Sequence, residues 1–325
     1  MSKAIIMQTT GGPDVLQWQD HDPGRPQAGE ALIEQKAVGL NYIDVYHRTG
    51  LYPLPELPAV PGMEGAGTVL ELGSGVEGLA PGDRVAYAGL PVGAYAERRC
   101  LPAHRLVGIP AAISFEQAAA MMLQGMTARY LLKGCYNVQE GTTILLQAAA
   151  GGVGLIMCQW ARHLGATVIG TVGSEEKAAL AREHGCAHTI LYDDEDVVRA
   201  VKDLTDGRGV DVAYDSVGRT TFDDSLKCLR PRGMMVSFGQ SSGPVEPLDL
   251  GKLAAQGSLF LTRPSLMHYT AERSDLLVHA EDLFELVLDN VIAVRISNRF
   301  KLEDAAEAHR LLEARKTTGS SIFLC

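Results

Sequence analysis

The feature that most constrains this chain is a glycine-rich turn placed directly between an apolar strand and an apolar helix. Residues 143–148 predict the strand and an apolar periodicity predicts the helix over 153–164, with the turn Ala149-Ala150-Gly151-Gly152-Val153-Gly154 between them. In dinucleotide-binding folds such glycines let the backbone approach a pyrophosphate, and the first helical turn offers unpaired amides to the anion. Ala149 replaces the usual first glycine, and a turn that serves packing only is the alternative. We expect four residues to contact a nucleotide cofactor: Gly151, Gly152, Val153 and Gly154.

Strands and helices alternate from about residue 125 onward. After the first helix, the pattern predicts a strand over 166–172, a helix over 174–184 and further strands at 188–192, 210–215, 234–238 and 258–262. This succession predicts a doubly wound α/β fold, in which a parallel sheet carries helices on both faces and ligands bind at the carboxyl ends of the strands. We assign residues 125–265 to this Rossmann domain.

The first third of the chain has a different pattern, with short apolar runs between Gly and Pro residues. The runs at 31–38, 67–72 and 84–87 predict an antiparallel β-rich domain over 1–124. The tail predicts a strand over 295–300, a helix over 302–314 and a strand over 320–324, and we expect residues 266–325 to complete the first domain. A proline-dense loop at 51–62 is long and stiff enough to wall a substrate cleft.

Composition excludes several classes of protein. With 29 Lys and Arg against 39 Asp and Glu, the net charge of −10 argues against nucleic-acid or anionic-membrane binding. The six cysteines form no CxxC pair, which favours free thiols in a reducing cytoplasm, and the N-terminal residues lack the pattern of a signal peptide. Residues 141–161 carry no charge and are long enough for a membrane span. Their Gln, Thr and Gly residues favour strand, turn and helix instead, so we expect no membrane association.

The choice of nicotinamide cofactor depends on the end of the second strand of the Rossmann domain. NAD-binding proteins place an Asp or Glu there for the ribose diol, whereas this chain has Gly173 and Ser174, with Ser174 as the expected N-cap of the next helix. Lys177 falls in the first helical turn, where the helix dipole disfavours a cation unless an anion accompanies it. We therefore expect the 2′-phosphate of NADPH at this point. Tyr192 flanks the adenine or the phosphate, or is a rim aromatic without a ligand.

Taken together, the motifs resemble the medium-chain dehydrogenase/reductase superfamily and, within it, the zeta-crystallin-like quinone oxidoreductases. The resemblance covers essentially the whole chain and rests on residues 41–46 (Asn-Tyr-Ile-Asp-Val-Tyr), 61–67 (Pro-Gly-Met-Glu-Gly-Ala-Gly), 82–85, 149–154, 214–218 and 237–239. It implies a GroES-like catalytic domain beside the Rossmann domain, NADPH as cofactor, a quinone as substrate and a homodimer.

Zinc alcohol dehydrogenases of the same superfamily carry a ligand cysteine and a Gly-His-Glu motif, and both are absent here. Asn41 stands in the cysteine region, Met63 replaces the histidine, and residues 89–110 hold only Cys100 in place of the four cysteines of a structural zinc lobe. We expect no metal. Without a Lewis acid to polarise a carbonyl, the substrate should already be electron-poor, as a quinone is.

Five polar residues are the candidates for contact with the substrate: Asn41, Asp44, Tyr46, Tyr52 and Arg263. Tyr46 or Tyr52 would hydrogen-bond a quinone oxygen or donate a proton, Asn41 would orient substrate or nicotinamide, and Arg263 would steady a developing oxyanion. Each has a structural alternative, and for Asp44 an ion pair with Arg48 is the favoured one. By resemblance, further residues are candidates for lining the NADPH site with Asn41: Tyr130, Gly173, Ser174, Lys177, Tyr192, Val217, Phe238, Gly239, Ser241 and Arg315.

Two other functions remain open from the sequence. The same scaffold serves NADPH-dependent reductases of enones and enoyl thioesters, and the residues do not separate these substrates from quinones. Crystallin-like members of the family permit a nucleotide-binding protein with a structural or RNA-binding role. The acidic balance and the lack of a stripe of basic and aromatic residues disfavour RNA.

Overall fold

The chain divides into two compact units in the computed structural model, which describes residues 2–325. Unit 1 comprises residues 1–126, 270–288 and 294–325, and unit 2 comprises residues 127–269 and 289–293. The division falls inside helix α3 (Met122–Arg129) and again beyond the last strand of unit 2. Each unit is built around its own main sheet.

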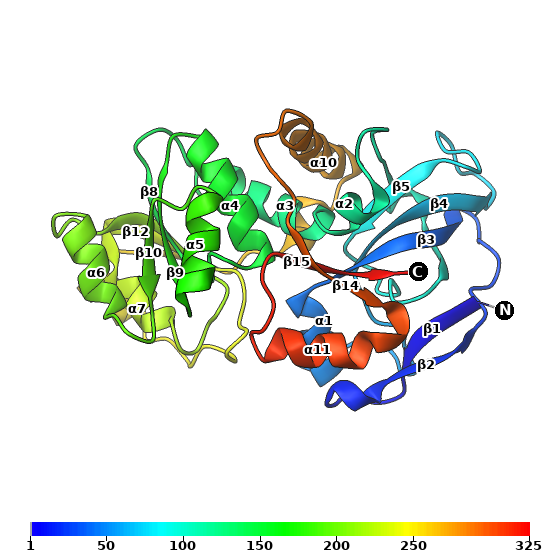
Figure 1. Cartoon of the computed structure of the whole chain (residues 1–325), viewed down its shortest axis with the longest axis horizontal. Coiled ribbons are helices and arrows are strands. Elements are labelled where there is room, and N and C mark those ends of the chain that lie inside the picture. Colours follow the sequence, from blue (N-terminus) through cyan, green and yellow to red (C-terminus); the bar gives the residue numbers. More distant parts are fainter. Residues whose placement is uncertain (1) are drawn as a thin grey trace. The chain divides into compact units, whose positions relative to one another are not determined.

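Unit 2 is built on a six-stranded parallel sheet with the strand order β10-β9-β8-β11-β12-β13 (Figure 1). The strands are β8 (Thr143–Leu146), β9 (Thr167–Val172), β10 (His188–Leu191), β11 (Val210–Asp215), β12 (Leu229–Ser237) and β13 (Phe260–Thr262). Helices α4 (Gly152–His163) and α5 (Glu175–Glu183) cover one face, and α6 (Val197–Leu204) and α7 (Phe222–Lys227) cover the other. Strand order reverses between β8 and β11, and ligands bind at such a switch point in doubly wound sheets.

The predicted Rossmann fold is therefore confirmed, and most of its elements agree with the sequence to within one or two residues. The uncharged stretch at 141–161 consists of β8, the glycine turn and most of α4. None of the helices in residues 2–325 combines the length and the apolar character needed to cross a bilayer. The short helix α8 (Gly251–Ala255) and a turn of helix α9 (Leu266–Tyr269) complete the unit, together with a π-helical segment at Tyr130–Cys135 that continues α3.

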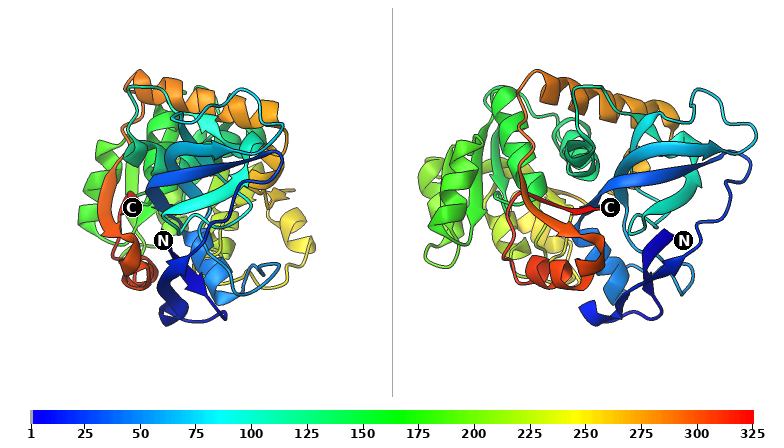
Figure 2. Two further views of the ribbon diagram at one scale, coloured as in Figure 1. Left: turned by 90° about the vertical axis from the view of Figure 1, so that its right-hand side faces the viewer. Right: turned by 45° about the vertical axis from the view of Figure 1, so that its right-hand side comes forward.

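Unit 1 contains a seven-stranded mixed sheet, β14-β15-β3-β4-β5-β7, with β6 also paired to β3, and a separate hairpin of β1 and β2. Its strands are β1 (Ser2–Met7), β2 (Leu16–His21), β3 (Glu30–Leu40), β4 (Glu64–Leu72), β5 (Arg84–Ala88), β6 (Arg98–Pro102), β7 (Val107–Gly108), β14 (Ile296–Lys301) and β15 (Ser320–Leu324). The C-terminal strand β15 pairs antiparallel with β3, as Figure 2 shows in red beside blue. The strands of the tail, β14 and β15, therefore lie in the same sheet as β3 and β4.

The helices of unit 1 are less visible in the sequence than its strands. They are α1 (Tyr42–Thr49), α2 (Phe115–Ala119), the first part of α3, α10 (Arg273–Leu288) and α11 (Ala305–Glu313). We expected an antiparallel sheet, but one pair of its strands is parallel: β14 and β15, which are joined by α11. Aromatic and aliphatic side chains from both ends of the chain, Ile5 and Phe323 among them, fill the core of this unit.

Candidate functional site

The glycine turn of unit 2 leaves no space for a side chain at Gly154 and little at Gly151. A Cβ atom added to Gly154 would lie 2.5 Å from the carbonyl oxygens of Ala148 and Ala149, and one on Gly151 would lie 3.3 Å from the former. Gly151 is the N-cap of α4 and makes no side-chain cap, so the first amides of the helix have no partner from it. Ala148 adopts a positive φ of 57°, a strained conformation that often marks a functional turn. The turn thus has the close packing and the free helix amides that a pyrophosphate requires.

Strand β9 is followed directly by Gly173, so the residue at this strand end is a glycine and not an Asp or Glu. A Cβ at Gly173 would lie 2.4 Å from the hydroxyl of Tyr192, so this tyrosine, 36% exposed, packs directly over the glycine. Ser174 caps α5 as expected, and its Oγ accepts a hydrogen bond from the backbone N–H of Lys177 at 3.3 Å. Gly173, Ser174, Lys177 and Tyr192 therefore lie at one corner of the sheet. Serine and lysine are residue types that bind phosphate, and the first turn of α5 also carries the exposed Glu175 and Glu176.

The buried carboxylate of Asp215 organises the loop that follows β11, and the backbone carbonyl of the same residue accepts hydrogen bonds from Phe238 and Gly239 in the loop after β12. Its Oδ1 accepts hydrogen bonds from the backbone amides of Val217 (2.7 Å) and Gly218 (2.9 Å), and its Oδ2 accepts from Thr221 and Ser225. The candidates Val217, Phe238, Gly239 and Ser241 lie in this pair of loops, where Ser241 N–H donates to the carbonyl of Ser216 at 3.2 Å. A Cβ on Gly239 would meet that same carbonyl oxygen at 2.4 Å.

Two further candidates, Arg263 and Tyr130, make contacts with other residues of unit 2. Arg263 is exposed as a residue, and its guanidinium donates a partly buried hydrogen bond to the carbonyl of Ser237, the last residue of β12, at 2.8 Å. Tyr130 is 3% exposed and stacks on Tyr269 with ring centroids 4.6 Å apart. Burial raises the pKa of Tyr130 well above its ordinary value, which keeps the phenol neutral. Tyr130 lies in the π-helical segment, a local geometry that is frequent at functional sites.

Asn41 is the N-cap of helix α1 in unit 1, and its side chain belongs to a buried polar network. Asn41 Nδ2 donates to Glu64 Oε2 at 2.6 Å, and Asn41 Oδ1 accepts from Gln124 Nε2 at 3.2 Å. The backbone N–H of Asn41 donates to Asp44 Oδ2 at 2.9 Å, which closes a capping box. Burial raises the pKa of Asp44 to about 7 and that of Glu64 to about 8, against the opposing effect of these donors.

The candidate tyrosines of unit 1 pack against each other. The ring centroids of Tyr46 and Tyr52 are 5.0 Å apart, and those of Tyr42 and Tyr46 are 5.4 Å apart. His47 lies beside Tyr52, and burial lowers its pKa to about 4, so this imidazole is neutral at physiological pH. The structure thus brings Tyr46 and Tyr52 together in an aromatic cluster at α1, in which Tyr42 was not expected.

The expectation that Asp44 pairs with Arg48 is wrong. Asp44 accepts a hydrogen bond from the hydroxyl of Tyr95 at 3.0 Å, while Arg48 makes a bidentate ion pair with Glu313, both distances being 2.8 Å. The physical reason is geometry: Arg48 lies one turn further along α1 and points to the end of α11, where its Nε also donates to the carbonyl of Gly11. The imidazole of His309 lies between Arg48 and Tyr95 and is within hydrogen-bond distance of both. Burial and the charge of Arg48 lower the pKa of His309 to about 3.

Arg315, the last of the candidates, follows α11 in a left-handed conformation with φ of 58°. Glycine and asparagine favour this position after a helix, so an arginine there bears a conformational cost. Its charge acts on Tyr42, whose pKa is raised by burial and by Glu313 and lowered by Arg315. Arg315 therefore lies near the aromatic cluster of the same unit.

Within residues 2–325, no group of three or more His, Cys, Asp or Glu side chains gathers in a way that could hold a metal ion. Met63, which stands in the place of a zinc-ligating histidine, is 1% exposed and packs in the core. All six cysteines are free thiols. The donor set does not suit zinc.

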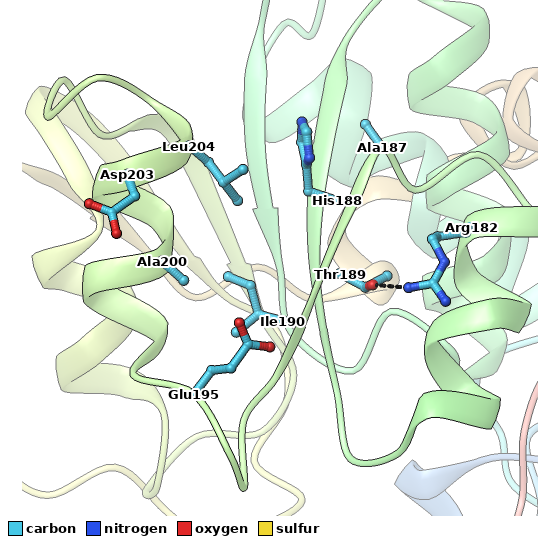
Figure 3. A pocket seen from close by; sticks show the side chains of 9 residues that line it. All are labelled: Arg182, Ala187, His188, Thr189, Ile190, Glu195, Ala200, Asp203 and Leu204. Atoms are coloured by element: carbon cyan, nitrogen blue, oxygen red, sulfur yellow. Dashed lines mark hydrogen bonds between the residues drawn. The ribbon is translucent and has the colours of Figure 1, made fainter.

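An open hollow of about 470 Å³ lies on unit 2 between α5, β10 and α6 (Figure 3). Arg182 points along its wall and donates to Thr189 Oγ1 at 2.6 Å, with Glu195 and Asp203 on the opposite side. None of the candidate cofactor or substrate residues lines this hollow. It therefore adds nothing to the candidate site.

Sequence reasoning missed the partners that hold the candidates in place: Glu64, Tyr95, Gln124, His309 and Glu313. Glu64 alone gave a local signal, because it is a carboxylate in the small and apolar stretch Gly62-Met63-Glu64-Gly65-Ala66. The others come from distant parts of the chain, and no local pattern identifies them.

Comparison with known proteins shows what the chain is similar to. Residues 152–275 match the family described as zinc-binding dehydrogenase, and residues 27–111 match the alcohol dehydrogenase GroES-like domain. The chain is 50% identical over 324 residues to a quinone oxidoreductase of Pseudomonas aeruginosa, with both chains covered fully. It is 43% identical to a 2-haloacrylate reductase of a Burkholderia species, covering 100% of this chain and 99% of the relative.

Among solved structures, the quinone oxidoreductase of Escherichia coli complexed with NADPH has a TM-score of 0.98 to this chain. The two sequences are 47% identical, and the match covers 99% of this chain and 100% of the other. The GroES-like and Rossmann-like architecture expected from the motifs is therefore confirmed.

Proposed function

The chain belongs to the quinone oxidoreductases of the zinc-binding dehydrogenase family, and from that premise we propose that it reduces quinones with NADPH and without a metal ion. The cofactor assignment rests on the residues at the end of β9 in unit 2. A glycine, a capping serine and a lysine lie where an NAD enzyme needs a carboxylate. The solved E. coli relative with NADPH supports the same cofactor.

The residues of unit 2 fit the nucleotide by their chemistry. We assign the pyrophosphate to the free amides of Gly152, Val153 and Gly154 at the start of α4, because these donors and the helix dipole favour an anion. We assign the 2′-phosphate to Lys177 and Ser174, with Tyr192 beside it. Arg315 of unit 1 is the further cation assigned to the cofactor. We assign four more residues of unit 2 to the nicotinamide half: Val217, Phe238, Gly239 and Ser241.

NADPH, when bound, supplies the hydride. The chain contributes binding, orientation and exclusion of water. We assign to Tyr46 or Tyr52 the hydrogen bond to a quinone oxygen, to Asn41 the orientation of substrate or nicotinamide, and to Arg263 the stabilisation of the oxyanion that forms as hydride arrives. Asp44 is fully buried, so we assign it the support of α1 through the backbone N–H of Asn41.

A second candidate function is the reduction of an activated C=C bond. The 2-haloacrylate reductase that is 43% identical to this chain favours it. Turnover of NADPH with a naphthoquinone, a simple enone, a 2-haloacrylate and a crotonyl thioester separates the two candidates. We expect the quinone to give the highest kcat/KM, and a preference for any of the other three would replace the quinone assignment.

We also propose a homodimer in the cytoplasm. Strand β13 is the edge of the six-stranded sheet, and its Phe260 and Leu261 are 57% and 38% exposed. An apolar edge strand is a surface that natural proteins cover, and a second copy covers it with twofold symmetry. Light scattering should give twice the chain mass, and Phe260→Lys should give the monomer. A wild-type monomer would contradict the proposal. The free thiols are the support for a reducing compartment.

A further inference from the structure

Glu64 is a fully buried carboxyl group that the proposed reaction has not used. It is the first residue of β4, its Oε2 accepts from Asn41 Nδ2 at 2.6 Å, and its Oε1 accepts from the backbone N–H of Leu123 at 2.8 Å. Removing a carboxylate from water costs several kcal/mol unless hydrogen bonds compensate for it. Because an apolar residue would fill this place in the core at lower cost, the fold alone does not explain a glutamate.

The neighbouring backbone is shaped to admit this carboxyl group. Gly39 in β3 has no Cβ, and one placed there would lie 2.1 Å from Glu64 Oε2 and 2.5 Å from the carbonyl of Ala119. The carboxyl oxygen therefore lies tightly against the strand. Its position relative to Asn41 is fixed by packing as well as by hydrogen bonds.

The Asn41 amide is held at both ends. Glu64 accepts from its nitrogen, and Gln124 Nε2 donates to its oxygen at 3.2 Å, while Gln124 Oε1 itself accepts from Ser320 Oγ at 2.6 Å. While Glu64 is ionised, turning the Asn41 amide over would place two donors against each other at Gln124 and two acceptors against each other at Glu64. Glu64 and Gln124 therefore favour one orientation of the Asn41 amide, and this orientation leaves one N–H of Asn41 for another partner.

We propose that Glu64 is a positioning residue for hydride transfer: it fixes the Asn41 amide so that the remaining N–H faces the nicotinamide or the quinone oxygen. The proposal rests on the proposed function, in which Asn41 orients one of these groups. Glu64 touches neither substrate nor cofactor in this account and acts only through Asn41. Gln124 supports the same orientation from the opposite end.

A double-mutant cycle tests whether Glu64 acts through Asn41. Glu64→Gln replaces one acceptor oxygen by an NH₂ group, which must face a donor at either Asn41 or Leu123. It should lower kcat about tenfold, the effect of one misplaced buried hydrogen bond. In the Asn41→Ala background the same substitution should change kcat by less than about twofold, because the amide that it orients is absent. A purely structural role would lower kcat equally in both backgrounds, and that result would overturn the proposal.

The matched control is Glu116→Gln, the same chemical change at an exposed ion pair with Arg299 in the same unit, and it should alter kcat in neither background. If Glu64→Gln does not fold, Gln124→Met provides the second cycle, with the same dependence on Asn41. The dissociation constant for NADPH is measured for all variants. If Asn41→Ala has no detectable turnover, the double-mutant cycle is calculated from these dissociation constants. Absence of coupling in both measurements contradicts the role of Glu64. Absence of quinone turnover in the wild-type protein instead contradicts the proposed function.

Discussion

The two units build their candidate sites from different materials. In unit 2 the candidate cofactor contacts are mostly backbone amides and glycines at the carboxyl ends of β8, β9, β11 and β12. In unit 1 they are side chains on and around α1, held by buried hydrogen bonds to residues from distant parts of the sequence. A site made of backbone depends on space, whereas a site made of side chains depends on complete satisfaction of polar partners.

The largest expected effect comes from removing the buried ion pair of unit 1. Glu313→Ala leaves the guanidinium of Arg48, 1% exposed, without its bidentate partner. An uncompensated buried charge should lower the free energy of unfolding by roughly 3 kcal/mol. Urea denaturation measures the change. The control Glu116→Ala removes one partner of the exposed pair with Arg299 and should cost less than about 1 kcal/mol. Equal losses would show that the buried network contributes no more than a surface pair.

A charge reversal sharpens the assignment of the phosphate corner in unit 2. Lys177→Glu should raise KM for NADPH by about ten- to a hundredfold, because a charge-assisted hydrogen bond contributes roughly 1.5–3 kcal/mol. KM for NADH should change far less, since NADH carries no 2′-phosphate. Lys202→Glu, the same reversal on α6, is the matched control and should affect neither cofactor. Equal changes for NADPH and NADH with Lys177→Glu would remove this lysine from the phosphate site.

One added methyl group tests whether the glycine turn of unit 2 depends on close backbone packing. Gly154→Ala places a Cβ within 2.5 Å of two carbonyl oxygens, which cannot move without displacing the turn. Overpacking of this kind costs about 1–3 kcal/mol, and NADPH binding should weaken as well because the turn carries the pyrophosphate amides. Gly108→Ala is the control, because a Cβ there meets nothing within 4 Å. Unchanged stability and NADPH affinity in Gly154→Ala would contradict the packing account.

The last expected effect is a pH dependence caused by Asp44. Its folded-state pKa of about 7 exceeds the ordinary value of 3.8, so the folded protein binds this proton more tightly than the unfolded chain. Asp44 therefore destabilises the fold above pH 7, and this penalty disappears as the pH falls toward 4. In Asp44→Asn, the amide oxygen still accepts from Asn41 and Tyr95, and the NH₂ group replaces an oxygen without a hydrogen-bond partner. The Tm of the variant relative to the wild type should rise with pH, and parallel Tm curves would contradict the raised pKa.

The same contrast explains how far the sequence could predict the molecule. The strands and helices of unit 2, the glycine turn and the N-cap Ser174 were predictable because each depends on a local pattern of residues. The network around Asn41 was not, because Glu64, Gln124 and Ser320 lie far apart in the chain and meet only after β3, β4 and β15 pair. The pairing of Asp44 with Arg48 failed for the same reason: the true partners, Tyr95 and Glu313, are distant in sequence.

The central claim is that this chain passes hydride from NADPH to a quinone by means of its own side chains and backbone. The most direct measurement is the steady-state rate of NADPH oxidation by a naphthoquinone, using protein dialysed against a strong chelator and analysed for bound metals. The account predicts full turnover with no stoichiometric metal. Loss of turnover on chelation, with recovery on addition of zinc, would contradict it.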